Sequence, residues 1–216
     1  MPSIRKNINF ENVNLKSKNM STKNLTLIVV VILILLLGGC GCSSYNGLVR
    51  VDQDVKTAWS NVETNYQRRT DLYNSVVKTI EGSANFEKST LKEVIAARAS
   101  ATSVHVDIND SASLARYQQA QGQLQGSFSR LMAVAEAYPD LKTTKSFQDF
   151  QTNIEGTENR INVARRDFNT AVNAYNMKVK IFPNNIFAGM FGFHEKPYYK
   201  SDAGSENAPD IQFNIK

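Results

Sequence analysis

The sequence of 216 residues contains few of the side chains from which reactive sites are usually built. It has only two cysteines, Cys40 and Cys42, and only two histidines, His105 and His194. Because both cysteines lie near the N-terminus, the rest of the chain has no disulfide framework and no thiolate nucleophile. Neither histidine stands in a spacing typical of a zinc site or a catalytic triad. We therefore expect no catalytic residue, no metal and no cofactor.

Clustered positive charge is also missing from most of the chain. The formal net charge is +5, and residues 1–24 carry five basic side chains and one acidic one, so 5 − 4 leaves about +1 for the remainder. A near-neutral domain lacks the basic footprint that nucleic-acid binding requires. We expect no nucleic-acid partner, and we assign residues 1–24 as a basic N-terminal segment.

The longest apolar run extends from Leu25 to Leu37 and is followed by Gly38-Gly39-Cys40. A run of this length suits the h-region of a cleaved signal, because a membrane-spanning helix needs about 20 apolar residues. The small residues before Cys40 are similar to the lipobox of bacterial lipoproteins, which makes Cys40 the candidate lipidation site. The alternative is an uncleaved transmembrane helix. Residues 25–42 form the membrane anchor in both cases.

The basic segment before this run predicts the orientation of the chain. By the positive-inside rule the N-terminus faces the cytoplasm, and the domain after the anchor lies on the extracytoplasmic side. The lipid bilayer is then the first predicted partner, through a single-pass or a lipid anchor. Met20 offers a second translation start, since the segment 20–24 would make a compact n-region.

Apolar residues at three- and four-residue steps predict four helices after the anchor. These helices cover residues 45–81, 83–104, 111–138 and 146–181. Ser83 is the expected cap of the second helix, and Ser146 with Asp149 fits a capping box for the fourth. Short connections favour antiparallel neighbours. The predicted fold class is all-α: an antiparallel up-down four-helix bundle with two long helices, preceded by an N-terminal membrane anchor.

The predicted bundle occupies residues 43–193. The apolar segment 186–193 is expected to fold back over the end of the bundle, with contact to a partner or a membrane as the alternative. Residues 194–216, rich in Ser, Asp, Gly, Asn and Pro beyond Tyr199, are predicted to form a flexible C-terminal tail.

One charged residue is predicted to point into the bundle. Arg69 shares a heptad face with Val62 and Val76, so its guanidinium needs a buried partner. Glu158, beside the inward stripe of the fourth helix, is the preferred partner, and Glu136 is the alternate. We interpret Arg69 and Glu158 as a structural ion pair that fixes helix register, with ligand binding as the alternative role.

Two stretches of the chain resemble the LemA family. The first includes Ala58-Trp59 and Tyr66-Gln67-Arg68-Arg69-Thr70-Asp71-Leu72, and the second includes Ala135-Glu136-Ala137-Tyr138-Pro139-Asp140-Leu141, Glu155-Gly156-Thr157-Glu158-Asn159-Arg160-Ile161 and Ala164-Arg165-Arg166-Asp167-Phe168-Asn169. The resemblance implies a membrane-anchored helical bundle outside the cytoplasmic membrane, with no enzymatic activity attached to it. The family usually has an Ile-Pro-Asn-Leu-Val run where this chain has Tyr73-Asn74-Ser75-Val76-Val77, so we expect a straight first helix.

These observations favour a non-enzymatic, membrane-anchored interaction or scaffold module of the cell envelope, with an unidentified membrane or envelope protein as partner. The alternative is a coiled-coil membrane protein that self-associates into a homo-oligomer. A hydrolase or a metal-dependent enzyme is the least favoured interpretation, because it requires inward polar groups that converge on one point.

Overall fold

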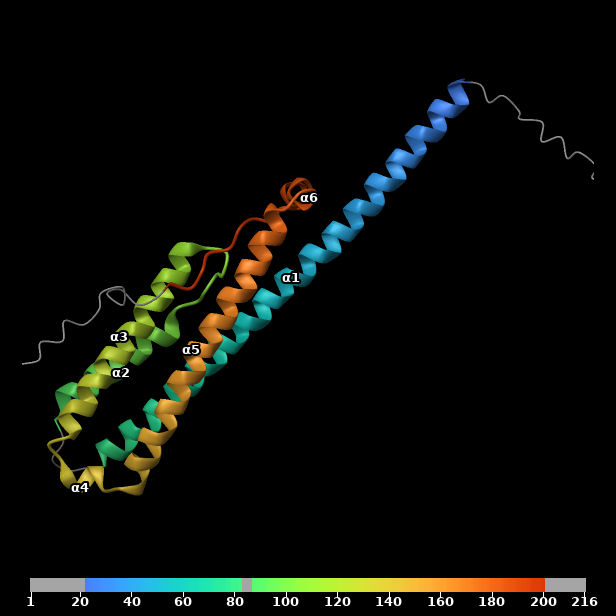
Figure 1. Cartoon of the computed structure of the whole chain (residues 1–216). Helices are drawn as coiled ribbons and strands as arrows, with labels where there is room; N and C mark the ends of the chain where they lie inside the picture. The colour runs from blue at the N-terminus through green and yellow to red at the C-terminus, as the bar shows by residue number, and fades with distance from the viewer. Residues whose placement is uncertain (1–21, 83–86, 201–216) are drawn as a thin grey trace, which may run out of the picture. The chain divides into compact units, whose positions relative to one another are not determined.

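Figure 1 shows the computed structural model of the chain, which describes residues 22–82 and 87–200. All regular elements in these residues are helices, so the all-α prediction is confirmed. The elements are α1 (Thr22–Glu81), α2 (Lys88–Ser103), α3 (Ser111–Ala135), α4 (Pro139–Lys142), α5 (Lys145–Lys180) and α6 (Asn184–Phe191). The predicted cap Ser83 lies outside the described residues.

The chain divides into two compact units, Met1–Cys42 and Ser43–Lys216, and α1 contributes residues to both. In the first unit, the large apolar side chains of Leu25 to Leu37 are exposed. This N-terminal part of α1 is long and apolar enough to cross a membrane, a criterion that a signal sequence also meets. The segment therefore has the composition of a membrane anchor.

The second unit has two short helices, α4 and α6, that the sequence pattern did not predict. The start of α5 also differs from the prediction. Thr144 is its N-cap and its hydroxyl accepts a hydrogen bond from the Phe147 N–H, whereas Asp149 pairs with Lys145 at 2.9 Å. The capping box of Ser146 and Asp149 is wrong, because Thr144 offers the same cap two residues earlier.

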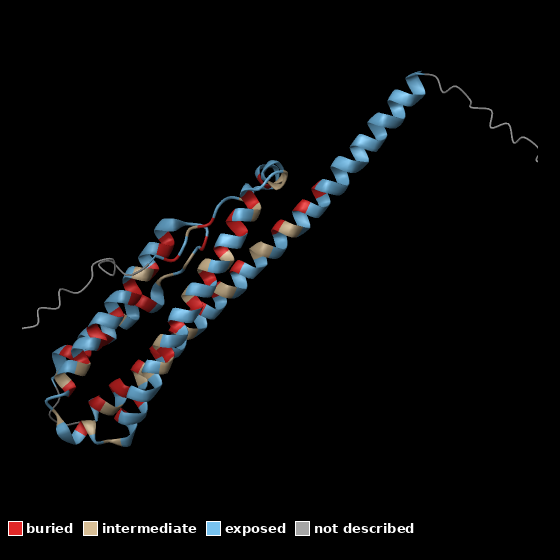
Figure 2. Cartoon of the chain, viewed as in Figure 1, coloured by how far each residue is buried: buried red, intermediate tan, exposed pale blue. Residues whose placement is uncertain are grey.

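The core of the second unit consists of two groups of buried apolar side chains. One group joins α1 to α5 and α3, and it centres on Trp59, whose ring lies 5.2 Å from Phe168 and 5.5 Å from Tyr117 between centroids. The other joins the end of α1 to α2 and α3, where Tyr73 stacks on Phe128 at 3.7 Å. Figure 2 shows the buried positions recurring at helical spacing along α3 and α5. Full burial of such a side chain contributes about 1.5–3 kcal/mol.

The helix α6 packs on the beginning of the second unit. Its Ala188 is buried, and the rings of Phe191 and Phe193 lie 5.0 and 6.0 Å from that of Tyr45. Gly192 ends the helix with a left-handed φ of 75°, a conformation that glycine adopts without steric cost. One side of the segment 186–193 therefore packs on the domain, as predicted. Other apolar side chains of α6 remain exposed.

Residues 194–200 are not part of a flexible tail, so the predicted boundary at residue 194 is wrong. This segment, which we call the strap, runs back along α5 in an extended form (Figure 1). Lys196 and Tyr199 are buried in it. Side-chain amides of α5 bond the strap's backbone, so it is fixed without belonging to a helix. Residues 201–216 lie outside the described residues.

Candidate functional site

The predicted lipidation site lies within α1. Cys40 and Cys42 are both exposed free thiols, and the helix continues through Gly38 and Gly39 without a break. Exposure leaves the Cys40 sulfur accessible, but the helix does not distinguish a cleaved lipoprotein signal from a spanning segment. Lipidation at Cys40 stays a prediction.

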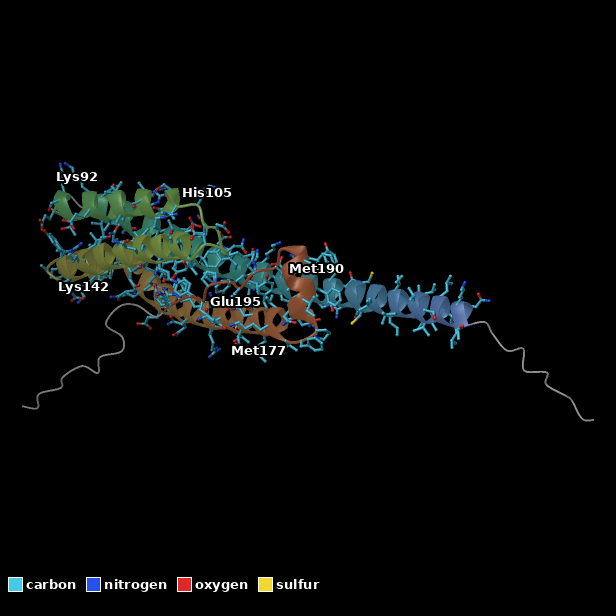
Figure 3. The ribbon with its side chains drawn as sticks, turned by 90° about the horizontal axis from the view of Figure 1, so that it is seen from above. Lys92, His105, Lys142, Met177, Met190 and Glu195 are labelled. Atoms are coloured by element: carbon cyan, nitrogen blue, oxygen red, sulfur yellow. The ribbon has the colours of Figure 1, made fainter. Side chains whose placement is uncertain are left out.

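The two histidines occupy separate exposed loops. His105 lies between α2 and α3 (Figure 3). His194 begins the strap, where its backbone carbonyl accepts a hydrogen bond of 2.9 Å from the Tyr175 hydroxyl. Within residues 22–82 and 87–200, the structure contains no group of three or more His, Cys, Asp or Glu side chains placed to hold a metal ion.

Arg69 is the most deeply buried charged side chain of the second unit, with an exposed fraction of 0%. Its Nη2 donates to Gln121 Oε1 of α3 at 2.7 Å, and its Nη1 lies 3.4 Å from Glu158 Oε1 of α5. The guanidinium also lies over the rings of Tyr66 and Tyr73, at 4.7 and 5.8 Å from their centroids. Arg69 thus links α1, α3 and α5 through a hydrogen bond, an ion pair and cation–π contacts.

The shorter of the two polar contacts is the one that the sequence interpretation missed. Gln121 lies in the inward apolar stripe of α3. A polar residue at such a position needs a buried hydrogen-bond partner, so the sequence did contain a signal for its contact with Arg69. Glu158 is at the edge of the core, with a side chain 29% exposed. The alternate partner, Glu136, is wrong, because it bonds Lys142 across the turn between α3 and α4.

A second polar cluster joins α1, α5 and the strap. The hydroxyl oxygens of Tyr66 and Tyr199 lie 2.6 Å apart in the interior. Arg165 Nε donates to the Tyr66 hydroxyl at 2.9 Å, and its guanidinium lies 4.8 Å from the centroid of the Tyr199 ring. Burial raises the pKa of the Tyr199 phenol, so this phenol keeps its proton at neutral pH. The cluster fixes the strap to α1 and α5.

Two asparagines of α5 hold the backbone of the strap. Asn176 donates to the carbonyl of Lys196 and accepts from its N–H, both at 2.9 Å, and Asn169 does the same for Tyr199 at 2.8 Å. The two asparagines are one heptad apart, so they lie on the same face of α5. Their amides satisfy backbone groups that would otherwise be unpaired on a buried extended segment.

Lys196 is a buried charged residue of the strap. Its Nζ lies 3.0 Å from Asp52 Oδ1 of α1, bonds Asn109 Oδ1 of the loop between α2 and α3, and lies 4.9 Å from the centroid of the Tyr175 ring. Burial opposes ionisation of Asp52, but hydrogen bonds from Lys196 and Lys56 outweigh it and hold the pKa of this carboxyl below its ordinary value. Burial raises the pKa of Tyr175 to about 12.

A shallow groove of about 350 Å³ runs between α1 and α5. Its lining is mostly amide and aliphatic, and consists of Asn61, Asn65, Asn159, Arg160, Val163, Ala164 and Asp167. This set has hydrogen-bonding groups but no nucleophile paired with a base. The buried titratable groups of the second unit described above are bonded to one another, so the arrangement is suited to fixing helices and the strap.

Comparison with known proteins gives relatives across most of the chain. Magnetosome proteins MamQ 1 and MamQ 2 of Paramagnetospirillum magneticum are each 25% identical over 175 residues, which covers 72% of this chain and 64% of the relative. Protein LemA of Metamycoplasma hominis is 27% identical over 144 residues, or 66% of this chain and 63% of the relative. The chain therefore matches slightly less than two thirds of the length of these relatives.

A family model described as "LemA family" matches residues 58–213. The match begins one residue before Trp59, at the centre of the first core group, and includes Arg69, the two asparagines and the strap. Because it extends over more than half of the sequence, the chain belongs to the LemA family.

Proposed function

We propose that this protein is a membrane-anchored, non-enzymatic module of the cell envelope that acts by interaction with other molecules. One observation carries the proposal: a single chain joins an exposed apolar helical segment to a helical domain whose buried polar groups are bonded to one another. The first part has the composition of an anchor, and the second is a packed helical domain that can present surfaces to a partner.

The use of the buried polar groups supports a non-enzymatic role. A catalytic site needs titratable groups that converge on an accessible point where a substrate can sit. Here Arg69, Tyr66, Tyr199 and Lys196 are buried and bonded to neighbouring elements. Both histidines instead lie in exposed loops.

We also propose that α1, α2, α3 and α5 form an antiparallel up-down bundle on the extracytoplasmic side. Support comes from the short connections, such as α4 between α3 and α5, and from the basic residues before the anchor. Several relatives are named magnetosome proteins. Those names support a role as one component of a larger cellular assembly, with a membrane or envelope protein as the partner.

The membrane part of the proposal is tested by fractionation and protease treatment of cells that carry the full-length chain. We expect the chain in the membrane fraction, with the domain digested in spheroplasts whose cytoplasmic membrane is intact. Recovery of the full-length chain in the soluble cytoplasmic fraction would overturn the proposal. Processing that globomycin blocks, and that Cys40→Ser abolishes while Cys42→Ser does not, would identify Cys40 as lipidated; unprocessed chains would identify a spanning helix.

The interaction part is tested by in-cell crosslinking of the anchored form, followed by mass spectrometry. Crosslinks from the second unit to one membrane or envelope protein, reproduced in independent cultures, would support the proposal. Crosslinks confined to a second copy of the chain, together with a purified mass above that of the monomer, would instead favour the self-associating coiled coil.

A further inference from the structure

Exposed apolar side chains of the second unit are concentrated at one place. Among described residues 43–200, eleven large hydrophobic side chains are exposed, and eight of them belong to the segments 45–49 and 177–191. The most exposed are Phe182 and Met190, at 74% and 73%. We define the α6 patch as the set Ile181, Phe182, Ile186, Met190 and Phe191. Single exposed apolar residues are ordinary on a protein surface, but a cluster of this kind marks a contact site.

The α6 patch is held in place by the residues beneath it. Ala188 is buried, the Ser44 hydroxyl donates to Asn184 Oδ1 at 2.8 Å, and the Phe193 N–H bonds the Ala188 carbonyl at 2.9 Å. Tyr45 packs edge-on against Phe191. One side of α6 is therefore fixed to the domain, while Ile186 and Met190 are exposed to the surroundings. Figure 3 shows the position of Met190 on this helix.

The length of chain between the anchor and Tyr45 limits what the α6 patch can meet. Eight residue steps separate Leu37, the end of the apolar run, from Tyr45, and they span at most about 29 Å even when fully extended. If the chain is instead anchored by a lipid on Cys40, five steps span at most about 18 Å. With either anchor, the patch stays close to the membrane surface at a high effective concentration.

We propose that the α6 patch inserts into the interfacial region of the membrane that anchors the chain. This inference rests on the proposed membrane anchor. Aromatic and apolar side chains on a short helix are the kind that partition into this region. The nearby charges are of mixed sign, since Lys180 pairs with Glu195 at 2.8 Å, so apolar contact rather than attraction to anionic lipid drives the insertion. The patch gives the domain a second point of attachment.

The experiment uses the full-length chain, reconstituted through its anchor into phosphatidylcholine vesicles with or without brominated acyl chains. Met190→Trp places a reporter on the α6 patch, and Ile95→Trp places a matched reporter on an exposed apolar position of α2. The wild-type chain, whose single tryptophan Trp59 is buried, gives the baseline. We expect brominated lipid to quench the Met190→Trp emission beyond the baseline and to leave the Ile95→Trp emission near it, with little change in 0.5 M salt.

Flotation of the same vesicles separates this inference from the proposed function. If the chain floats with the vesicles but the Met190→Trp emission is quenched no more than that of Ile95→Trp, the anchor stands and the insertion of the α6 patch is wrong. A patch reserved for a protein partner would give that same result. If the chain does not float, the anchor itself is wrong, and the insertion is overturned with it.

Discussion

Asn176 and Lys196 pair as two residues of adjacent β-strands would, with a donor and an acceptor each and both distances at 2.9 Å. Here a side-chain amide on α5 takes the place of one backbone. The strap therefore continues the packed structure past the last helix while it remains extended, and it brings Lys196 to Asp52 of α1.

Asn176→Ala is expected to lower the free energy of unfolding by about 1–3 kcal/mol, because it leaves a buried N–H and a buried carbonyl of the strap without partners. The measurement is denaturant unfolding of the full-length chain in detergent, with hydrogen exchange at residues 194–200. Asn61→Ala, at an exposed mid-helix position of α1, controls for the gain in helix propensity. Equal stability of the two variants, with no faster exchange in the strap, would contradict the role of Asn176.

Arg69→Met is expected to cost about 1–3 kcal/mol of stability, because the Gln121 side chain loses its charged donor in the interior. The second substitution in Arg69→Met/Gln121→Leu should recover part of that loss, since it removes the stranded amide. Arg68→Met, on the exposed face next to Arg69, should be close to neutral. If Arg69→Met unfolds with unchanged stability and cooperativity, no buried pair exists at this position.

Glu158→Gln separates the two polar contacts of Arg69. Because the Nη1–Oε1 distance is 3.4 Å and Glu158 is partly solvated, this substitution should cost less than about 1 kcal/mol. A loss as large as that of Arg69→Met would show that the ion pair, and not the hydrogen bond with Gln121, is the main support of the guanidinium.

Asp52 makes the stability of the domain sensitive to acid. Its pKa in the folded chain lies below the ordinary value of 3.8, so its contribution is fully present above about pH 4 and is lost as pH falls through the folded-state pKa. The stability difference between the wild type and Asp52→Asn should therefore be constant from pH 7 to about pH 4 and shrink below it. Asp54→Asn, at an exposed position nearby, is the control. A difference that stays constant down to pH 2 would disprove the assignment.

Gly192 and Gly122 should respond to alanine with opposite signs. Gly192→Ala forces a side chain into the left-handed region and should cost about 1 kcal/mol or more, with looser attachment of α6. Gly122→Ala adds a Cβ that meets nothing within 4 Å in the middle of α3, and should stabilise by about 0.5–1 kcal/mol. Thermal unfolding of both variants measures the contrast. A stabilising Gly192→Ala would show that the cap is not held in this conformation.

The sequence pattern was sufficient to predict the long helices and the inward position of Arg69, because apolar residues at helical spacing report directly on the buried face. The pattern could not predict the strap, since an extended segment held by side-chain amides has no periodicity of its own. Asn169 and Asn176 stand one heptad apart on α5, but their neighbours on that face include Arg165 and Asn173, so the sequence did not mark this face as a buried one.

The short elements were missed for a related reason. The helix α4 is a single turn, and α6 is so apolar that its sequence predicts burial on all sides, although only Ala188 is fully covered. The sequence pattern also could not predict which polar side chains pair with one another inside the core. Spacing identifies which side chains face inward, but the selection of Gln121 over Glu136 by Arg69 depends on which helices become neighbours.

The contacts that close the domain join residues very far apart in the chain. Ser44 meets Asn184 across 140 positions, and Tyr66 meets Tyr199 across 133. A ribosome must therefore synthesise nearly the whole domain before its first helix can complete its packing, and such distant closures are slow. If the domain lies on the extracytoplasmic side, as proposed, the N-terminal segment brings the chain to a translocation channel before these contacts exist, and the chain passes through the channel unfolded.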